Sequence, residues 1–150
     1  MARLKTGFRF SEVMGGTYSL TSKPKETRRF EFLARMEAPS LSKHLRDGGM
    51  TLEGTLEMDG FADAVPIEGR LTMLPFTRKL IRYEFAFTAN DGKPYRFAGQ
   101  KDIKFTKLRK TFTTLPGSVF DADDREIATA LTYFDARTDL LQFLSSWRPA

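Results

Sequence analysis

Residues 28–38 read RRFEFLARMEA, and apolar and charged side chains alternate along this stretch. The apolar positions are Phe30, Phe32, Ala34 and Met36. The charged positions between and beside them are Arg29, Glu31, Arg35 and Glu37. Successive side chains of a β-strand point to opposite faces, so the pattern predicts a strand with one buried and one solvated face.

The same alternation recurs along most of the chain. The segments that carry it are 8–20, 29–37, 51–58, 65–73, 81–88, 95–105, 111–115 and 127–133. The sequence Asn90-Asp91-Gly92 is a strong hairpin signal, and the other connections are also short. Eight strands that are each apolar on one face predict an antiparallel sheet closed on itself, because closure leaves no exposed edge strand.

We therefore predict an all-β protein with a single domain over residues 1–150, built as an eight-stranded antiparallel up-and-down barrel. A β-sandwich is the competing architecture. Ser40 is a candidate N-cap and predicts a short helix near 40–47. Leu140, Leu144 and Trp147 share one helical face, which predicts a C-terminal helix near 136–147.

Composition excludes several kinds of chemistry. The chain has no cysteine and only one histidine, His44, which excludes disulfides, thiol catalysis and multi-histidine metal sites. It has no G-x-G-x-x-G, Walker A or G-x-S-x-G motif, so we expect neither a cofactor nor a metal. No apolar run approaches the roughly 20 residues of a membrane helix, and no signal-peptide pattern is present, so we expect a cytoplasmic protein.

Positive charge is concentrated in one part of the chain. Residues 78–110 carry ten Lys/Arg and three Asp/Glu, out of a net charge of +5. The densest group is Lys104, Lys107, Arg109 and Lys110. This group could contact an anionic surface, or it could be a solvated turn between two strands. Nucleic-acid binding is disfavoured, because the aromatic face is the one that the barrel must bury.

The predicted interior leaves two interpretations open. An eight-stranded barrel is just wide enough to be filled by side chains or to hold one small ligand. Many phenylalanines share the inward parity and could fill it. Gly54, Gly69 and Gly99 also point inward, where they either leave space or let neighbouring backbones approach closely.

Two charged residues, Glu12 and Lys101, break the apolar inward pattern. An unpaired buried charge is costly, so each needs a partner or a route to water. The simplest partner for each is the other, in a buried ion pair. Alternatively, the two residues anchor the polar end of a ligand. In a third interpretation Glu12 is a general base and Lys101 an electrophilic or Schiff-base group.

Several motifs, in order, resemble one known region. Residues 10–16 (FSEVMGG) resemble an F-x-E-x-M-x-G signature, and residues 95–103 (YRFAGQKDI) resemble Y-x-F-x-G-x-K-x-I/V. Residues 111–115 are similar to a T-T-T-L segment, and residues 131–147 look like a strand leading into an amphipathic helix. Together they resemble the non-flavin, C-terminal accessory region of bacterial cholesterol-oxidase-like (GMC) oxidoreductases. The resemblance implies a stand-alone companion domain of a sterol or lipid enzyme, without the flavin chemistry. The predicted shape is similar to lipocalin-like (calycin) barrels.

The favoured function is binding of a small hydrophobic ligand (a sterol, a fatty acid or a lipid-derived metabolite) inside the barrel. The predicted ligand-binding residues are Glu12, Lys101, Met14, Phe32, Met36, Leu56, Tyr83, Phe85 and Phe97. One alternative is a non-catalytic interaction module with an oxidoreductase partner. The other is a small enzyme that uses Glu12 and Lys101, which we consider less favoured, and we assign no catalytic residue.

Overall fold

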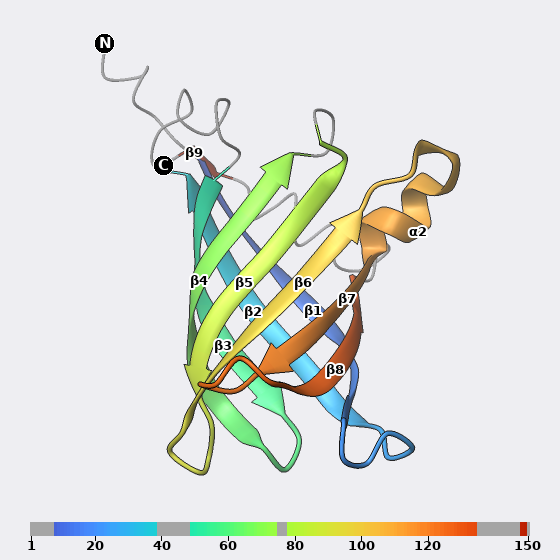
Figure 1. Ribbon diagram of the computed structural model, residues 1–150. Helices are drawn as coiled ribbons and strands as arrows, with labels where there is room; N and C mark the ends of the chain where they lie inside the picture. The colour runs from blue at the N-terminus through green and yellow to red at the C-terminus, as the bar shows by residue number, and fades with distance from the viewer. Residues whose placement is uncertain (1–7, 39–48, 75–77, 135–147, 150) are drawn as a thin grey trace.

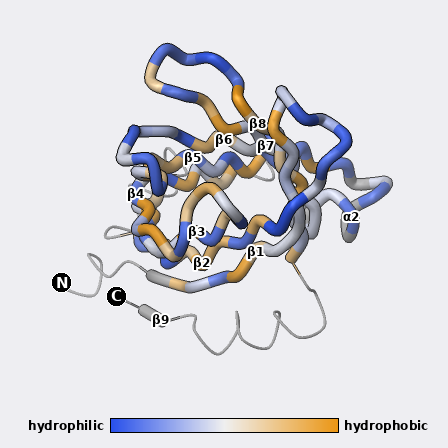
Figure 2. The backbone as a smooth tube through the Cα atoms, turned by 90° about the horizontal axis from the view of Figure 1, so that it is seen from below, coloured by the Kyte–Doolittle hydropathy of each residue, from blue (hydrophilic) through white to orange (hydrophobic). Residues whose placement is uncertain are grey.

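The computed structural model describes residues 8–38, 49–74, 78–134 and 148–149. Eight long antiparallel strands form a closed barrel, seen from the side in Figure 1 and from one end in Figure 2. They are β1 (Phe8–Leu20), β2 (Arg28–Ala38), β3 (Gly49–Met58), β4 (Ala62–Leu74), β5 (Leu80–Thr88), β6 (Pro94–Asp102), β7 (Thr114–Phe120) and β8 (Glu126–Tyr133). The all-β barrel prediction is confirmed.

The strand order is the up-and-down order expected from the short connections. Each strand pairs with its neighbour in sequence, and β8 closes the ring against β1. Strand β1 pairs with β2 from Phe8 to Tyr18 but with β8 only from Gly15 to Leu20. The two-residue strand β9 (Arg148–Pro149) pairs with the beginning of β1.

The connection between β6 and β7 differs from the prediction. It contains the 3-10 helix η2 (Phe105–Lys107) and the α-helix α2 (Leu108–Thr113), so the strand predicted over 111–115 begins only at Thr114. The Thr111 hydroxyl donates to the Lys107 carbonyl at 3.0 Å and accepts from the Lys104 amide at 3.2 Å. These local hydrogen bonds satisfy the backbone in a helical turn and override the β-propensity of threonine.

The basic group therefore lies on a helical segment and not in a simple turn between strands. Lys104, Lys107 and Lys110 are exposed, so contact with an anionic surface stays a prediction. The side chain of Arg109 and the helices predicted at 40–47 and 136–147 lie outside the described residues.

An aromatic cluster occupies the middle of the barrel. Its members are Phe30, Phe32, Phe85 and Phe97, all buried. The rings of Phe85 and Phe97 stack with centroids 4.9 Å apart. Phe32 packs edge-on against Phe85 at 5.2 Å. At this level the interior is filled by side chains, as in a packed core.

At the lower end of the barrel in Figure 1, hydrogen bonds and one ring contact link neighbouring hairpins. The Tyr18 hydroxyl donates to the Asp59 carbonyl at 2.5 Å, and the Asn90 amide donates to the Phe61 carbonyl at 3.0 Å. Phe61 also packs against Tyr95, with ring centroids 4.9 Å apart. These contacts hold the turns at this end of the barrel together.

The inward glycines do not open space for a ligand. A Cβ atom at Gly54 would lie 1.8 Å from the Leu33 carbonyl oxygen, and one at Gly69 would lie 1.9 Å from that of Glu84. A Cβ at Gly99 would meet the Phe97 ring at 2.8 Å. Of the two interpretations in the sequence, close approach is therefore the correct one: Gly54 and Gly69 admit a neighbouring backbone, and Gly99 admits an aromatic ring.

Candidate functional site

Glu12 on β1, Tyr83 on β5 and Lys101 on β6 face the barrel interior. The β5–β6 pairing runs without a register shift from Leu80 opposite Asp102 to Thr88 opposite Pro94, so the alternation holds through Lys101. Glu12 is 8% exposed and Lys101 is 4% exposed. The prediction that both charges point inward is confirmed.

These three residues form one polar cluster, which we call the Glu12–Tyr83–Lys101 cluster. The Tyr83 hydroxyl donates a hydrogen bond to Oε1 of Glu12. The Lys101 Nζ lies over the Tyr83 ring, 5.2 Å from its centroid. Within the part of the chain that the structure describes, no hydrogen bond or ion pair joins Lys101 directly to Glu12. Tyr83 thus connects the two charges that the sequence suggested would pair.

The Lys101 ammonium is a buried hydrogen-bond donor. It carries three N–H donors, and none of them meets an acceptor among the described residues. An aromatic face can contribute as much as about 2 kcal/mol to a desolvated cation, but it replaces only part of the lost hydration. Lys101 is therefore a buried donor whose lost hydration is replaced only in part by its contacts with the described residues.

Burial shifts two pKa values in the cluster. Desolvation lowers the pKa of Lys101, and the negative charge of Glu12 partly opposes this shift. Desolvation, the charge of Glu12 and their hydrogen bond raise the pKa of Tyr83 well above its ordinary value. Tyr83 therefore stays a hydrogen-bond donor, whereas Lys101 releases its proton more readily than a surface lysine does.

These shifts predict two opposite trends of stability with pH. The folded protein releases the Lys101 proton at a lower pH than the unfolded chain. The free energy of unfolding therefore increases with pH between the lowered pKa of Lys101 and its ordinary value of 10.5. The folded protein retains the Tyr83 proton above pH 10.0, where the unfolded chain loses it. The stabilisation from Tyr83 is therefore complete below pH 10.0 and declines as the pH rises above this value.

Urea unfolding across this alkaline range can separate the two trends. We expect Lys101→Met to remove the rise and Tyr83→Phe to reduce the decline, to which the raised pKa values of Tyr18 and Tyr95 also contribute. A Lys101→Met protein with the same pH slope as the unsubstituted protein would show that Lys101 is not desolvated in the folded state.

Apolar residues lie next to the cluster on the adjoining strands. Ile81 is opposite Lys101 in the β5–β6 register, and Leu71 is opposite Tyr83 in the β4–β5 register. Met36 is the next inward residue after Ala34, the partner of Glu12. All of these side chains are buried. The cluster is thus a small polar group in an apolar interior, the composition expected of a ligand site.

The structure places all nine predicted ligand-binding residues in the barrel interior. Phe32, Phe85 and Phe97 belong to the aromatic cluster, and Met14 and Leu56 both lie opposite Phe32 in their registers. The remaining four surround or form the polar cluster: Glu12, Met36, Tyr83 and Lys101. Contact of any of the nine with a ligand stays a prediction.

The linking role of Tyr83 was missed in the sequence. Its inward parity was a usable signal, because a buried tyrosine hydroxyl normally finds a hydrogen-bond partner. Glu12 is the inward acceptor in the sequence, but the two residues are separated by 71 positions. Only the closure of the barrel brings them together.

Of the pairings between the eight long strands, the β6–β7 pairing has the fewest paired positions, and it ends beside Lys101. Strands β6 and β7 pair over only four positions, ending with Gly99 opposite Gly117. Strand β6 continues to Asp102 without β7, and the chain crosses to β7 through η2 and α2. We call the short β6–β7 pairing the β6–β7 seam, and Lys101 lies two residues beyond its last paired position.

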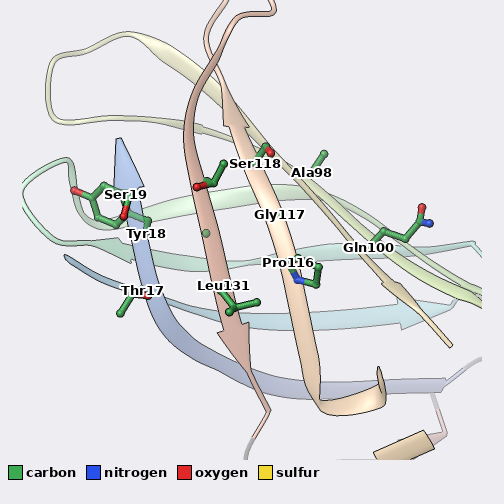
Figure 3. Close-up of a pocket in the computed structure, with 11 residues that line it drawn as sticks. Thr17, Tyr18, Ser19, Ala98, Gln100, Pro116, Gly117, Ser118 and Leu131 are labelled. Atoms are coloured by element: carbon green, nitrogen blue, oxygen red, sulfur yellow. The ribbon is translucent and has the colours of Figure 1, made fainter. Parts of the chain in front are cut away.

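A hollow of about 600 Å³ lies on the outer wall over the same seam. Figure 3 shows its lining, which includes Gln100 on β6, Pro116 on β7 and Leu131 on β8. A second outer hollow of about 520 Å³ lies over β2 to β6. The seam thus combines few backbone hydrogen bonds with a depression in the surface.

Two other features bear on the kind of protein. The described residues hold no group of three or more His, Cys, Asp or Glu side chains placed to bind a metal ion. None of the helices in the described ranges is long and apolar enough to span a membrane.

Comparisons with protein-family models, with curated proteins and with solved structures found no match to this chain. The fold and the site define it as an eight-stranded up-and-down β-barrel with a buried ionisable cluster. The resemblance to the accessory region of GMC oxidoreductases stays a prediction. The function is therefore argued from the geometry of the site.

Proposed function

We propose that the protein binds one small, mainly apolar ligand inside the barrel, with the polar end of the ligand at Lys101. The observation that supports this proposal is a buried ammonium group with no hydrogen-bond acceptor among the described residues. Barrels of eight strands hold single small ligands, and such sites combine apolar walls with a few polar groups.

The filled part of the barrel limits where the ligand would lie. The aromatic cluster fills the middle of the barrel and the linked turns lie below it, so the ligand would lie between Phe32 and the upper end. There it would contact Met36 and the Glu12–Tyr83–Lys101 cluster. A sterol, a fatty acid or another lipid-derived metabolite has the required combination of an apolar body and one polar end.

Binding of the neutral apolar fluorophore N-phenyl-1-naphthylamine tests this proposal. Met36→Trp puts a larger side chain on the inward face of β2, whereas Glu37→Trp puts the same side chain on its outward face. We expect Met36→Trp to weaken binding about tenfold or more, equivalent to about 1.4 kcal/mol, because an indole displaces the probe. Glu37→Trp should bind like the unsubstituted protein.

Far-UV circular dichroism and a conservative Met36→Leu variant show whether the barrel is intact. Met36→Leu should retain probe binding, because its volume is nearly unchanged. Equal affinity of Met36→Trp and Glu37→Trp, or no probe binding by the folded protein, would overturn the proposed function. Native mass spectrometry of freshly purified protein adds a direct readout, since a resident ligand adds mass that denaturation removes.

A second candidate function is docking on a partner enzyme. Leu131, which is 38% exposed, lines the outer hollow, whose lining carries no charged side chain, and Tyr133, which is 50% exposed, follows it two residues further along β8. This face could be the docking surface of an interaction module, and the resemblance would make the partner a flavin-containing oxidoreductase. Co-purification of one stoichiometric flavoenzyme, lost in Leu131→Glu, would favour this candidate over ligand binding.

A further inference from the structure

The charges of the site restrict the chemistry of the ligand. When both groups are ionised, the carboxylate of Glu12 and the ammonium of Lys101 sum to zero. A ligand carboxylate at Lys101 would place a second negative charge beside Glu12, which is itself buried. An uncompensated buried charge costs several kcal/mol, whereas a carbonyl group accepts a hydrogen bond and adds no charge.

We propose that the ligand is an uncharged aldehyde or ketone and that Lys101 holds its carbonyl carbon as a reversible imine. This inference rests on the proposed function and deepens it, because it names the ligand class at the same site. Its basis is the position of one buried amine, with no acceptor in the described part of the chain, over the ring of a tyrosine whose hydroxyl is bonded to a carboxylate.

The reaction needs no additional reactant. The neutral Lys101 amine adds to the carbonyl carbon, a C–N bond forms, and a proton from nitrogen moves to the oxygen. The carbinolamine then loses its C–O bond, and water leaves with the second nitrogen proton. The sum is one carbonyl compound plus one amine giving one imine plus one water, with no oxidation or reduction.

The environment supplies the neutral amine that this addition requires. Burial lowers the pKa of Lys101, and each pKa unit of lowering raises the neutral fraction about tenfold at a pH below the pKa. Lys93, by contrast, is exposed to solvent. Lys101 should therefore react in preference to the other lysines.

Glu12 and Tyr83 suit the product as well. A protonated imine is a cation, and the negative charge of Glu12 and the face of the Tyr83 ring both stabilise a cation at the Lys101 nitrogen. The hydrogen bond from Tyr83 orients the Glu12 carboxylate. Both are positioning residues, since neither forms a bond to the ligand in this scheme.

Reductive trapping tests the imine. The full-length protein is incubated with decanal and cyanoborohydride, and peptides are then mapped by mass spectrometry. We expect one decyl group on Lys101, at about tenfold or more the level on any other lysine. Lys101→Arg keeps a cation but cannot form an imine, so it should lose this label, whereas Lys93→Met should keep it. Equal labelling of Lys101 and the surface lysines would overturn the inference.

A competition experiment on the unsubstituted protein does not depend on the folding of any variant. Decanal, decanoate and decane are each tested for displacement of N-phenyl-1-naphthylamine. Decanal should displace the probe best, and tighter competition by decanoate would overturn the inference. If the probe binds but Lys101 is not labelled, the proposed function stands and the imine does not. If the probe fails to bind and Lys101 is not labelled, both fail.

Discussion

Replacing Phe97 by alanine is expected to lower the free energy of unfolding by about 3–5 kcal/mol. The Phe97 ring is buried among Phe30, Phe32 and Phe85, with centroid distances of 5.5, 5.9 and 4.9 Å. The resulting cavity would border Gly99 and Gly117. Because glycine has no side chain, neither residue could fill this cavity. Urea unfolding measures the loss.

Phe61→Ala is the matched control for this prediction. Phe61 is only partly buried and packs against one ring, that of Tyr95, at 4.9 Å. We expect a clearly smaller loss than at Phe97. Equal losses would contradict the conclusion that the aromatic cluster is the main packing element of the barrel.

A double substitution isolates the contact between Phe97 and the seam glycines. A Cβ at Gly117 would lie 2.4 Å from the Phe97 ring, so Gly117→Ala alone should destabilise the protein. In the Phe97→Ala background the same substitution should cost less, because the ring is gone. The expected coupling is about 0.5–3 kcal/mol, and additive effects would show that the ring does not lie over Gly117.

Gly54→Ala is expected to have the second large effect, a loss of about 1–3 kcal/mol or more in the free energy of unfolding. The added Cβ would meet the Leu33 carbonyl oxygen at 1.8 Å and the Ala34 Cα at 3.2 Å. Both atoms belong to the backbone of β2, so the strands themselves must separate. Chemical denaturation and the amide exchange of β2 and β3 would report this separation.

Gly15→Ala provides the comparison. It is also a strand glycine, but its Cβ would meet only the Glu31 side chain, at 3.4 Å or more. Alanine restricts the unfolded chain more than glycine, so this variant should be neutral or more stable by about 0.4–1 kcal/mol. A loss at Gly15 as large as that at Gly54 would mean that glycine flexibility, and not close strand approach, is what the barrel requires.

Much of the barrel could be predicted because its signals are local. The alternation of inward and outward side chains in residues 28–38 and in the other segments depends only on the pleat of a strand. Short connections favour pairing between strands that follow one another in the sequence. The inward direction of Glu12 and Lys101 followed from the same parity. No bulge interrupts the pairing of β6 with β5, so Lys101 faces the same side of the sheet as Phe97, four residues earlier.

Predictions failed where local hydrogen bonds competed with a strand, and stayed open where distant residues decide the outcome. The segment 105–113 has strand-like residues, but the hydrogen bonds of Thr111 satisfy a helical turn. Whether the inward glycines open space or admit a neighbour depends on atoms of other strands, such as the Leu33 carbonyl at Gly54. A sequence pattern carries no information on such distances.

The sequence by itself determined the all-β class, the closed up-and-down order and which side chains face the interior. These properties follow from the period of the strand and from the need to bury one apolar face. The tertiary structure decided that the aromatic cluster fills the middle of the barrel, that β6 and β7 separate beside Lys101, and that Tyr83 joins Glu12 to the lysine. The reason is physical: these contacts span the barrel, and their geometry exists only when strands far apart in sequence are brought into register by closure.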